Sequence, residues 1–334
     1  MKRAGITVIA GILLILLCSG CSNSKCKEMV IPLSPETKSF LNTKPDMRKS
    51  LYDENGWNNY TAPSIASREK GYQEMPTADE ETGQTIELEN KVTERMYGQA
   101  HVYTLSPEEG FDSVIMYVHG GGYIFCGDSY HERMCDSLCS SLNAMVVLPF
   151  YGLAPQENYK AAYELLHAVY ADILKLGKPI YIMGDSSGGG LAEGFVMDLK
   201  AKSISLPEKV VLISPWVDMT MTNPEIENYE EDDLMLTKYG TEQMAEMWSE
   251  GDDRKDYRLS PLYGDVKGMP ETMITAGTRE ILYPDIRLMY EKYKDNKESC
   301  IIVVGEGMFH GFPMMKDDFK ESKQCTEMII NFLK

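Results

Sequence analysis

The sequence predicts an α/β fold in which a mostly parallel sheet is covered by helices on both faces. Six apolar runs have the length of buried strands and are rich in β-branched residues. They are SVIMYV (113–118), AMVVLP (144–149), IYIM (180–183), VVLI (210–213), TMITA (272–276) and IIVV (301–304). Helical patterns lie between several of these runs, for example at residues 159–174 and 284–293. Because strands and helices alternate along the chain, we expect a sheet that is buried on both sides.

Length and charge restrict the domain organisation and the possible partners. A chain of 334 residues can form one large core, and we expect a single domain with insertions. Two polar stretches, residues 29–90 and 216–257, fall outside the alternating pattern, and the acidic run at 225–233 is expected to be a solvated surface. The formal charge of −18 argues against a nucleic acid as partner, because phosphate binding requires a basic face.

The N-terminus has the features of a targeting segment. Lys2 and Arg3 precede an apolar run at residues 6–17, which is shorter than the roughly 20 residues of a spanning helix. The run ends in LCSGC and resembles a bacterial lipoprotein signal, although Cys18 stands where that pattern usually has leucine. The resemblance implies a signal peptide at residues 1–20 and a lipid anchor on Cys21, in the cell membrane and facing outside the cytoplasm. A plain secretory signal and an uncleaved anchor remain alternatives.

A glycine-rich turn, GDSSGG at residues 184–189, follows the apolar run 180–183 and precedes a helical pattern. Only Ser186 has glycine two positions before it and two positions after it, as the nucleophile motif G-x-S-x-G requires. A serine on such a sharp turn needs small neighbours, and the N-terminus of the following helix favours an anion above it. Phosphate-loop and dinucleotide-binding glycine patterns do not fit this segment. A structural glycine turn with a surface serine remains the alternative.

A second glycine motif, HGGG at residues 119–122, follows the run 113–118. Consecutive glycines allow backbone N–H groups to approach a ligand closely, and this motif forms part of the oxyanion hole in lipases and esterases. We predict the N–H groups of Gly121, Gly122 and Ser187 as donors to an oxyanion. His119 is expected to brace the loop rather than to transfer protons.

A nucleophilic serine requires a base, and the chain contains five histidines. Four of them lie in strand or helix patterns or in the glycine motif: His101, His119, His131 and His167. His310 remains, in the loop after the run 301–304, where sites of open α/β sheets collect. The orienting acid is expected between the serine and this histidine. Glu280, in the loop after the run 272–276, is preferred, and Asp285 is the alternative, although it suits the first turn of a helix.

These motifs resemble those of the hormone-sensitive-lipase branch of the α/β-hydrolases, which contains many bacterial acetyl esterases and short-chain carboxylesterases. The resemblance covers about residues 97–334 and rests on HGGG (119–122), GDSSGG (184–189), SPW (214–216), SPLYGD (260–265) and GMFHGF (307–312). It implies an α/β-hydrolase fold with Ser186 as nucleophile, His310 as base and an acid at Glu280, where many members carry aspartate. Gly152 and Gln156 stand where many relatives have arginine and glutamate, which affects a structural salt bridge rather than the chemistry.

The same resemblance implies a helical cap over the pocket, built from the N-terminal region and from an insert after the strand that ends at residue 213. The predicted organisation is a signal peptide (1–20), a polar tether and N-terminal cap region (21–90), and an α/β-hydrolase domain (91–334) with a cap insert at about 216–257. Tyr123 and Trp216 are predicted to line the substrate pocket.

The sequence therefore predicts a serine carboxylesterase that hydrolyses short-chain, acetyl-like esters of small molecules. It contains no HExxH motif and no Cys or His spacing typical of a metal site, so we expect no metal and no cofactor. Apart from Cys18 and Cys21, the cysteines form no CxxC pair, and we expect no essential disulfide. An amidase or peptidase with the same triad and a non-catalytic lipid-anchored binding protein remain alternatives, and the oligomeric state stays open.

Overall fold

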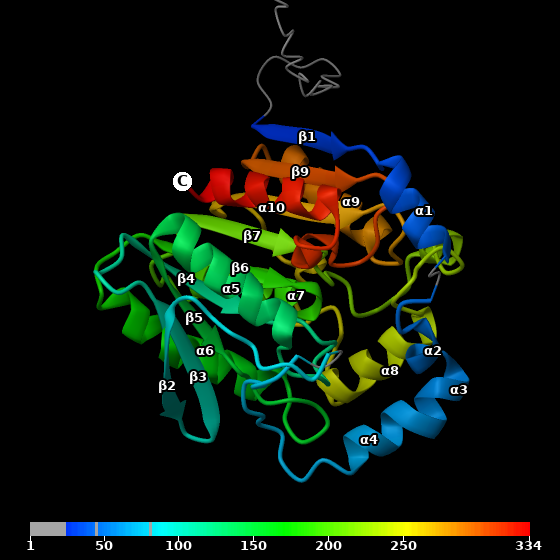
Figure 1. Cartoon of the computed structure of the whole chain (residues 1–334), viewed down its shortest axis with the longest axis horizontal. Coiled ribbons are helices and arrows are strands. Elements are labelled where there is room, and N and C mark those ends of the chain that lie inside the picture. Colours follow the sequence, from blue (N-terminus) through cyan, green and yellow to red (C-terminus); the bar gives the residue numbers. More distant parts are fainter. Residues whose placement is uncertain (1–24, 44–45, 80–81) are drawn as a thin grey trace, which may run out of the picture.

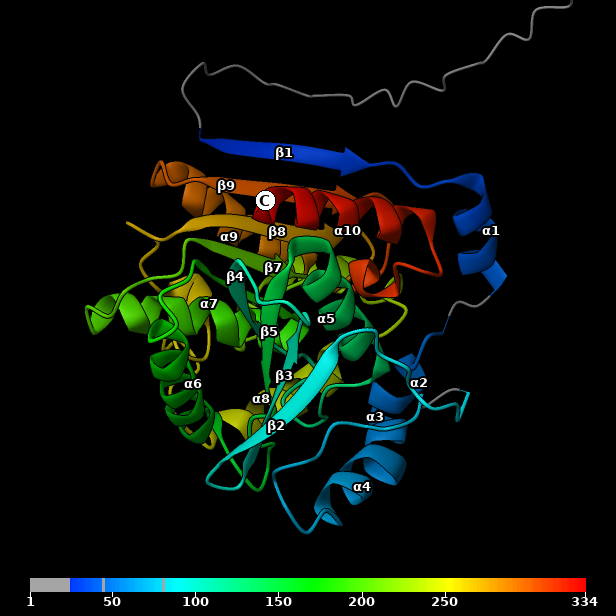
Figure 2. The same cartoon turned by 60° about the vertical axis from the view of Figure 1, so that its left-hand side comes forward.

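A single mixed sheet organises the protein. The computed structural model describes residues 25–43, 46–79 and 82–334, and within them nine strands form one sheet in the order β1-β9-β8-β7-β6-β4-β5-β3-β2 (Figure 1, Figure 2). Neighbouring strands from β1 to β5 in this order are parallel, whereas β3 and β2 are added in antiparallel pairs. The strands are β1 (Cys26–Ile31), β2 (Lys91–Tyr97), β3 (Ala100–Ser106), β4 (Ser113–Val118), β5 (Ala144–Pro149), β6 (Ile180–Asp185), β7 (Lys209–Ile213), β8 (Glu271–Gly277) and β9 (Cys300–Gly305). The predicted α/β fold with a mostly parallel sheet is confirmed.

Each predicted apolar run forms a strand. β4 and β5 have the predicted bounds, and β6 to β9 extend slightly beyond them. Alternate side chains of a strand point to opposite faces of the sheet, so each strand contributes to two cores. In β4, Val114 and Met116 belong to one hydrophobic cluster, and Ile115 and Tyr117 belong to the other.

Long helices cover both faces of the sheet. α5 (Ser129–Leu142) and α10 (Lys320–Leu333) pack on one face, and α6 (Tyr159–Leu174), α7 (Ser186–Ala201) and α9 (Tyr283–Asp295) pack on the other (Figure 1). Side-chain caps fix where two of them begin. Asp128 accepts hydrogen bonds from the first backbone N–H groups of α5, and Asn158 accepts one from Lys160 in α6. The layers therefore match those expected from the alternating pattern.

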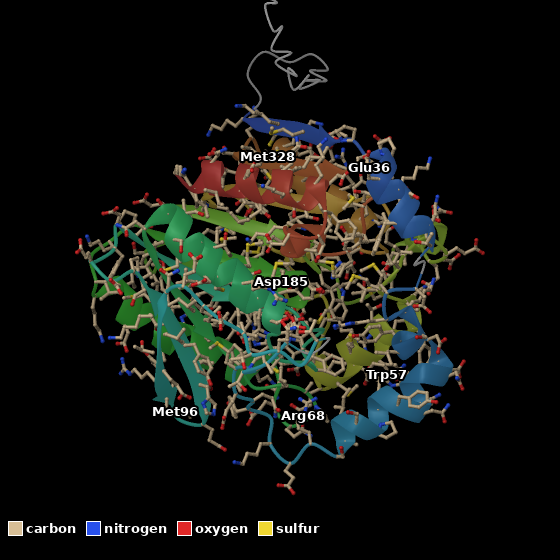
Figure 3. The ribbon with its side chains drawn as sticks, viewed as in Figure 1. Glu36, Trp57, Arg68, Met96, Asp185 and Met328 are labelled. Carbon is tan, nitrogen blue, oxygen red and sulfur yellow. The ribbon has the colours of Figure 1, made fainter. Side chains whose placement is uncertain are left out.

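Three short helices of the N-terminal region lie beside α8 (Lys238–Ser249), on the side toward which the parallel strands point (Figure 1). They are α2 (Lys49–Tyr52), α3 (Glu54–Gly56) and α4 (Ala62–Ala66). The other short elements are α1 (Pro35–Thr43), η1 (Trp57–Thr61), η2 (Pro224–Asn228), η3 (Pro261–Tyr263) and η4 (Phe312–Met315). The backbone N–H of Met47 donates to the carbonyl oxygen of Leu234 at 2.7 Å, and Trp57 is buried among these helices (Figure 3). The N-terminal region and the insert after β7 are thus joined.

Residues 26–31 differ from the prediction of a polar tether. They form β1, which pairs in parallel with β9 at the edge of the sheet. Backbone hydrogen bonds hold this segment although several of its side chains are exposed. The predicted signal peptide and Cys21 lie outside the described residues, and no helix within the described residues has the length and apolar character needed to span a membrane.

Candidate active site

The predicted nucleophile lies on a strained turn between β6 and α7. Ser186 is the first residue of α7 and has φ 52°, a left-handed conformation that is uncommon for residues other than glycine. A Cβ atom on Gly188 would lie 2.2 Å from the carbonyl oxygen of Val118, and one on Gly184 would lie 2.4 Å from that of Gly188. Any side chain at either glycine would collide with backbone, so the turn can form only with these two small residues.

Three predicted site residues form one hydrogen-bonded chain. His310 Nε2 lies 2.8 Å from Ser186 Oγ, and His310 Nδ1 lies 2.6 Å from Glu280 Oε2. The other oxygen of Glu280 accepts from the backbone N–H of Gly277 at 2.6 Å and from Ser214 Oγ at 3.0 Å. Glu280 is completely buried, and these contacts fix the direction of its carboxylate. The base therefore lies between a hydroxyl and an immobilised carboxylate.

The electrostatic surroundings of His310 favour its protonated form. Burial lowers the pKa of the imidazole, but the hydrogen bond and charge of Glu280 outweigh burial, and Asp233 adds to them. The resulting pKa lies above the usual value of 6.5. Asp233 is itself buried and accepts from the backbone N–H groups of Met235, Leu236 and Ile281, while burial raises its pKa to about 6.

Asp285, the alternative acid, lies in the first turn of α9 and is bonded to a different partner. Its Oδ1 accepts a hydrogen bond from Asn223 Nδ2 at 2.7 Å. Burial raises the pKa of Asp285 to about 7, with Asn223 opposing the shift. The geometry thus associates Glu280, and not Asp285, with His310.

The predicted oxyanion loop has the backbone that its glycines allow. Gly121 has φ 105° and Gly122 has φ 60°, and both line the same cavity as Ser186. A Cβ atom on Gly122 would lie 2.4 Å from the Sδ atom of Met244 in α8. Ser187 is the second residue of α7, where backbone N–H groups have no partner within the helix. The three predicted donors therefore lie on segments that meet at the serine.

His119 lies behind this loop rather than in it. It is fully buried and stacks on Tyr151 with ring centroids 4.3 Å apart. Its Nδ1 lies 2.8 Å from the carbonyl oxygen of Gly120, and burial lowers its pKa to about 4. A neutral, stacked imidazole in this position braces the loop.

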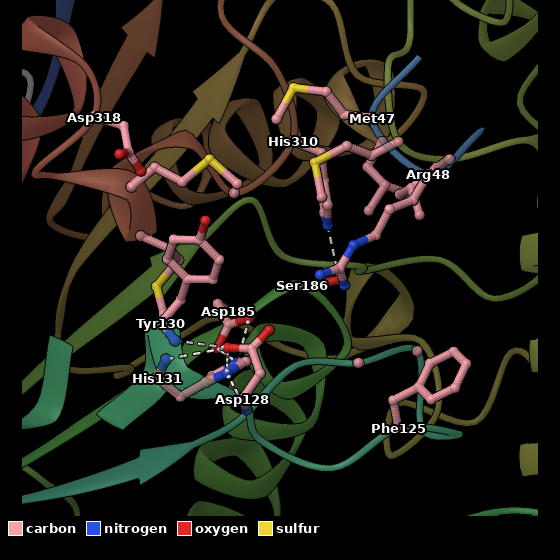
Figure 4. A pocket seen from close by; sticks show the side chains of 18 of the residues that line it. Met47, Arg48, Phe125, Asp128, Tyr130, His131, Asp185, Ser186, His310 and Asp318 are labelled. Carbon is pink, nitrogen blue, oxygen red and sulfur yellow. Dashed lines mark hydrogen bonds and ion pairs between the residues drawn. The ribbon is translucent and has the colours of Figure 1, made fainter. Parts of the chain in front are cut away.

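A second imidazole, predicted from the sequence only as part of a helix, connects the loop to the nucleophile turn. His131 lies 2.7 Å from Asp128 Oδ1 and 3.2 Å from Asp185 Oδ2 (Figure 4). Asp185 also accepts from the backbone N–H of Gly120 at 3.1 Å. Burial opposes the charged form of His131, but the carboxylates of Asp185 and Asp128 outweigh it and raise its pKa well above the usual value. The capping pattern D-x-x-H at residues 128–131 is the sequence signal for this cluster.

Ser186 and His310 line a cavity of about 1390 Å³. Its lining combines the N-terminal region and the insert after β7, and includes Phe40, Arg48, Leu51, Trp216, Met235 and Met244. Trp216 is thus among the lining residues, as predicted. Tyr123 is not: it is buried, stacks on Trp248, and donates from its hydroxyl to the carbonyl oxygen of Ser187 at 2.8 Å. Its ring supports the site from behind and does not face the cavity.

Gly152 and Gln156, which stand where many relatives have arginine and glutamate, make local contacts of a different kind. The side-chain amide of Gln156 donates to the carbonyl oxygen of Arg68 at 3.1 Å, beyond the end of α4. A Cβ atom on Gly152 would lie 2.5 Å from the Cγ atom of Glu157. Here the segment at residues 152–156 holds the N-terminal region by a neutral hydrogen bond.

Across the described part of the chain, no group of three or more His, Cys, Asp or Glu side chains is arranged to hold a metal ion.

Comparison with known proteins agrees with this geometry. A family model described as alpha/beta hydrolase fold matches residues 115–314. The chain belongs to the alpha/beta-hydrolase family. It is 29% identical to an esterase of Acinetobacter venetianus over 66% of this chain and 74% of that protein, and 27% identical to an acetyl-hydrolase of Streptomyces hygroscopicus over 66% and 75%.

Solved structures of lipases and esterases are also similar to this hydrolase. A hormone-sensitive lipase from a metagenome library is 28% identical and has a TM-score of 0.69, with 73% of this chain and 84% of that chain covered. An esterase/lipase from an uncultured bacterium has a TM-score of 0.75 at 24% identity, with 90% and 98% covered, and shows the fold. The predicted class, a carboxylic ester hydrolase, is confirmed by these similarities.

Proposed function

We propose that this hydrolase is a serine carboxylesterase for short-chain, acetyl-like esters, with Ser186 as nucleophile, His310 as base and Glu280 as orienting acid. The observation that carries the proposal is the continuous chain of contacts, 2.8 Å from Ser186 Oγ to His310 Nε2 and 2.6 Å from His310 Nδ1 to Glu280 Oε2, in the wall of one cavity. Serine, imidazole and carboxylate in this order make the hydroxyl nucleophilic at neutral pH.

The proposed reaction has two halves. Ser186 Oγ attacks the acyl carbon while His310 Nε2 takes the hydroxyl proton, and Glu280 stabilises the imidazolium through Nδ1. The ring then gives that proton to the leaving alkoxide, and the acyl group remains on Ser186. Water, deprotonated by His310, attacks the acyl-enzyme, and the carboxylic acid leaves while the serine regains its proton.

Backbone donors supply the charge stabilisation in this proposal. The N–H groups of Gly121, Gly122 and Ser187 lie on the loop and helix end next to the nucleophile, where the tetrahedral oxyanion forms. Each such donor contributes on the order of 3 kcal/mol to the stabilisation of the transition state. His119 and the ion-paired His131 hold the loop on which two of these donors lie.

The preference for a short acyl group rests on the packing around the oxyanion loop. The Met244 side chain of the cap insert lies directly against Gly122, and Trp216 forms another part of the wall. These large side chains limit the space beside the acyl carbon, so that each added methylene must gain burial or collide. The acetyl-hydrolase of Streptomyces hygroscopicus among the relatives supports the same preference.

Two serine variants and a series of esters test the proposal. Ser186→Ala should abolish hydrolysis of p-nitrophenyl acetate and labelling by a fluorophosphonate. Ser187→Ala should keep most activity, because the Ser187 hydroxyl makes no hydrogen bond within the described residues and only its backbone N–H is used. In the wild type, kcat/KM should decrease steeply from acetyl to palmitoyl esters, and p-nitroacetanilide should be cleaved far more slowly. Labelling that persists in Ser186→Ala would disprove the assignment.

For localisation, we propose that Cys21 is lipidated and anchors the enzyme in the cell membrane, outside the cytoplasm. The support is the charged, apolar and small-residue pattern of residues 1–21. In a bacterial host the protein should appear in the membrane fraction, and Cys21→Ala should move it to the soluble fraction or leave it uncleaved. An unmodified mature N-terminus in mass spectrometry would contradict the anchor.

A further inference from the structure

Methionine side chains form much of the wall of the active-site cavity. Among the described residues, five methionines from three segments line it: Met47, Met235, Met244, Met314 and Met315. The thioether side chain is unbranched and flexible, so it adapts to neighbours of different shape. A wall of this kind fits an apolar group without requiring one exact outline.

Three large apolar side chains of the same wall are exposed to solvent. Phe40, Leu51 and Phe125 have exposed fractions of 38%, 40% and 38%, and all three line the cavity. Figure 4 shows Met47 and Phe125 on different sides of Ser186. Exposed apolar surface that gathers in one place is typical of a binding groove. The apolar wall thus continues from the proposed nucleophile to the opening of the cavity.

The buried polar side chains of the wall already have hydrogen-bond partners. In the described part of the chain, and apart from His310, they are Thr37, His131, Asp185 and Thr241. Thr37 donates to Glu321 Oε2 at 2.7 Å, and Thr241 donates to a backbone carbonyl oxygen at 2.9 Å. His131 and Asp185 are bonded to each other. A sugar with several hydroxyl groups would lose hydrogen bonds to water here without gaining equivalent ones, which costs free energy.

The remaining charged side chains do not select a charged substrate. Within the described ranges, five charged residues of the lining are exposed: Glu36, Asp46, Arg48, Asp318 and Lys320. Both signs are present, and salt screens exposed charges. These residues therefore lie where the cavity opens to water and leave its apolar wall as the main feature available to a substrate.

The size of the cavity indicates which part of the ester this wall contacts. Its volume of about 1390 Å³ is much larger than an acetyl group requires and exceeds the roughly 300–1,000 Å³ of most ligand pockets. If the acyl group is short, as proposed above, the remaining space belongs to the alcohol part.

We propose that this apolar wall binds the alcohol part of the substrate, so that the preferred substrates are acetyl-type esters of large apolar alcohols and not of sugars. This inference rests on the proposed esterase function of Ser186. Each methylene of the alcohol that becomes buried should raise kcat/KM, by up to about fourfold. The flexible methionines should accept linear as well as ring-shaped alcohols.

Isomeric esters distinguish the two sides of the ester group. Octyl acetate and ethyl octanoate contain the same atoms, but the apolar chain belongs to the alcohol in the first and to the acyl group in the second. Below the solubility limits, kcat/KM for octyl acetate should exceed that for ethyl octanoate and that for ethyl acetate by at least about tenfold. Acetylated glucose should react more slowly than octyl acetate. Equal kcat/KM values for octyl and ethyl acetate, or a preference for acetylated glucose, would overturn the proposal.

Matched substitutions test whether the wall is the source of the preference. Leu51→Ser and Met315→Gln make the wall more polar, and each should lower the ratio of kcat/KM for octyl acetate to that for ethyl acetate by about fourfold. Leu288→Ser changes a leucine of α9 that is 51% exposed and does not line the cavity, and it should leave the ratio unchanged.

The outcomes separate this inference from the proposed function. An unchanged ratio in both wall variants would overturn the inference and leave the esterase function intact. A preference for ethyl octanoate would contradict the short acyl group as well, and no hydrolysis of any of these esters would overturn both the inference and the function.

Discussion

Replacement of Glu280 by glutamine should disable the base by changing its tautomer. Oε1 of Glu280 accepts two hydrogen bonds, from the Gly277 N–H at 2.6 Å and from Ser214 Oγ at 3.0 Å. The carbonyl oxygen of the new amide should take this position, which directs its NH2 group at His310 Nδ1. Nδ1 must then accept a hydrogen bond, and the ring proton moves to Nε2. An imidazole protonated at Nε2 cannot accept the proton of Ser186.

The expected loss follows from these contacts. The Glu280→Gln variant keeps the size of the residue and its contacts with Gly277 and Ser214, but it loses both the tautomer and the negative charge that lies 2.6 Å from the ring. In the triad of a serine protease, the corresponding change of acid to amide produces the wrong tautomer and lowers kcat by about 10,000-fold. A loss of the same size here corresponds to roughly 5 kcal/mol of activation free energy.

Steady-state hydrolysis of p-nitrophenyl acetate measures this loss, with Asp285→Asn as the matched control. Asp285 is also a buried acid in the segment after β8, but it contacts Asn223 rather than the histidine. Its pKa is raised to about 7, so neutralising it changes little near neutral pH, and kcat should stay close to that of the wild type. A wild-type kcat in Glu280→Gln, or a severe loss in Asp285→Asn, would refute the assignment of the acid.

Three further predictions concern pH and the backbone. In a pH profile, kcat/KM should fall as the pH decreases through the pKa of His310 and reach half of its maximum above pH 6.5, because the protonated ring cannot act as a base. Glu193 is buried and bonded to Tyr293, and burial raises its pKa from 4.5 to about 7. The folded state therefore binds more protons than the unfolded state between pH 4.5 and about 7, and Glu193 should make stability fall as the pH rises, by up to about 3 kcal/mol. Calorimetry should show a smaller decrease in Glu193→Gln than in the wild type, where Asp233 and Asp285 with their raised pKa values contribute the rest. Gly188→Ala should lower both Tm and activity, because its Cβ would lie 2.2 Å from the Val118 carbonyl oxygen, and a wild-type melting curve would contradict this collision.

The strands of the sheet centre could be predicted because they are buried on both faces. β4 consists only of buried residues, so its sequence is a continuous apolar run with a clear beginning and end. β1 gave no such signal. It lies at the edge, and Lys27 and Glu28 are exposed, so its sequence resembles a polar tether. What makes it a strand is the backbone pairing with β9, a contact between residues more than 270 positions apart.

Residues of the site were predictable where backbone conformation restricts the side chain. The turn that carries Ser186 and the oxyanion loop at residues 119–122 require glycines at fixed spacing, and these glycines appear directly in the sequence. The prediction that Tyr123 lines the pocket was wrong because distant packing partners, and not a local glycine pattern, decide where its ring lies. Its position beside the glycine loop suggested the pocket, but its φ of 64° and its stacking on Trp248 place the ring in the core. Side-chain direction after an irregular turn depends on distant packing partners, and no local pattern encodes it.

Ser214 shows how much of the proposed triad depends on such distant contacts. Its hydroxyl donates to Glu280 Oε1 at 3.0 Å and accepts from the backbone N–H of Gly311 at 3.0 Å, so a single side chain connects the acid loop to the loop of the base. From the sequence, the SPW segment (214–216) indicated only the resemblance to the family and not this role of Ser214. The hydrogen-bond partners of Ser214 lie 66 and 97 residues farther along the chain. Both hydrogen bonds are buried or partly buried, where a fixed dipole has a larger effect than in water. The position of the imidazole relative to Ser186 is therefore determined by the carboxyl ends of β6, β7, β8 and β9 together, and not by the three triad residues alone.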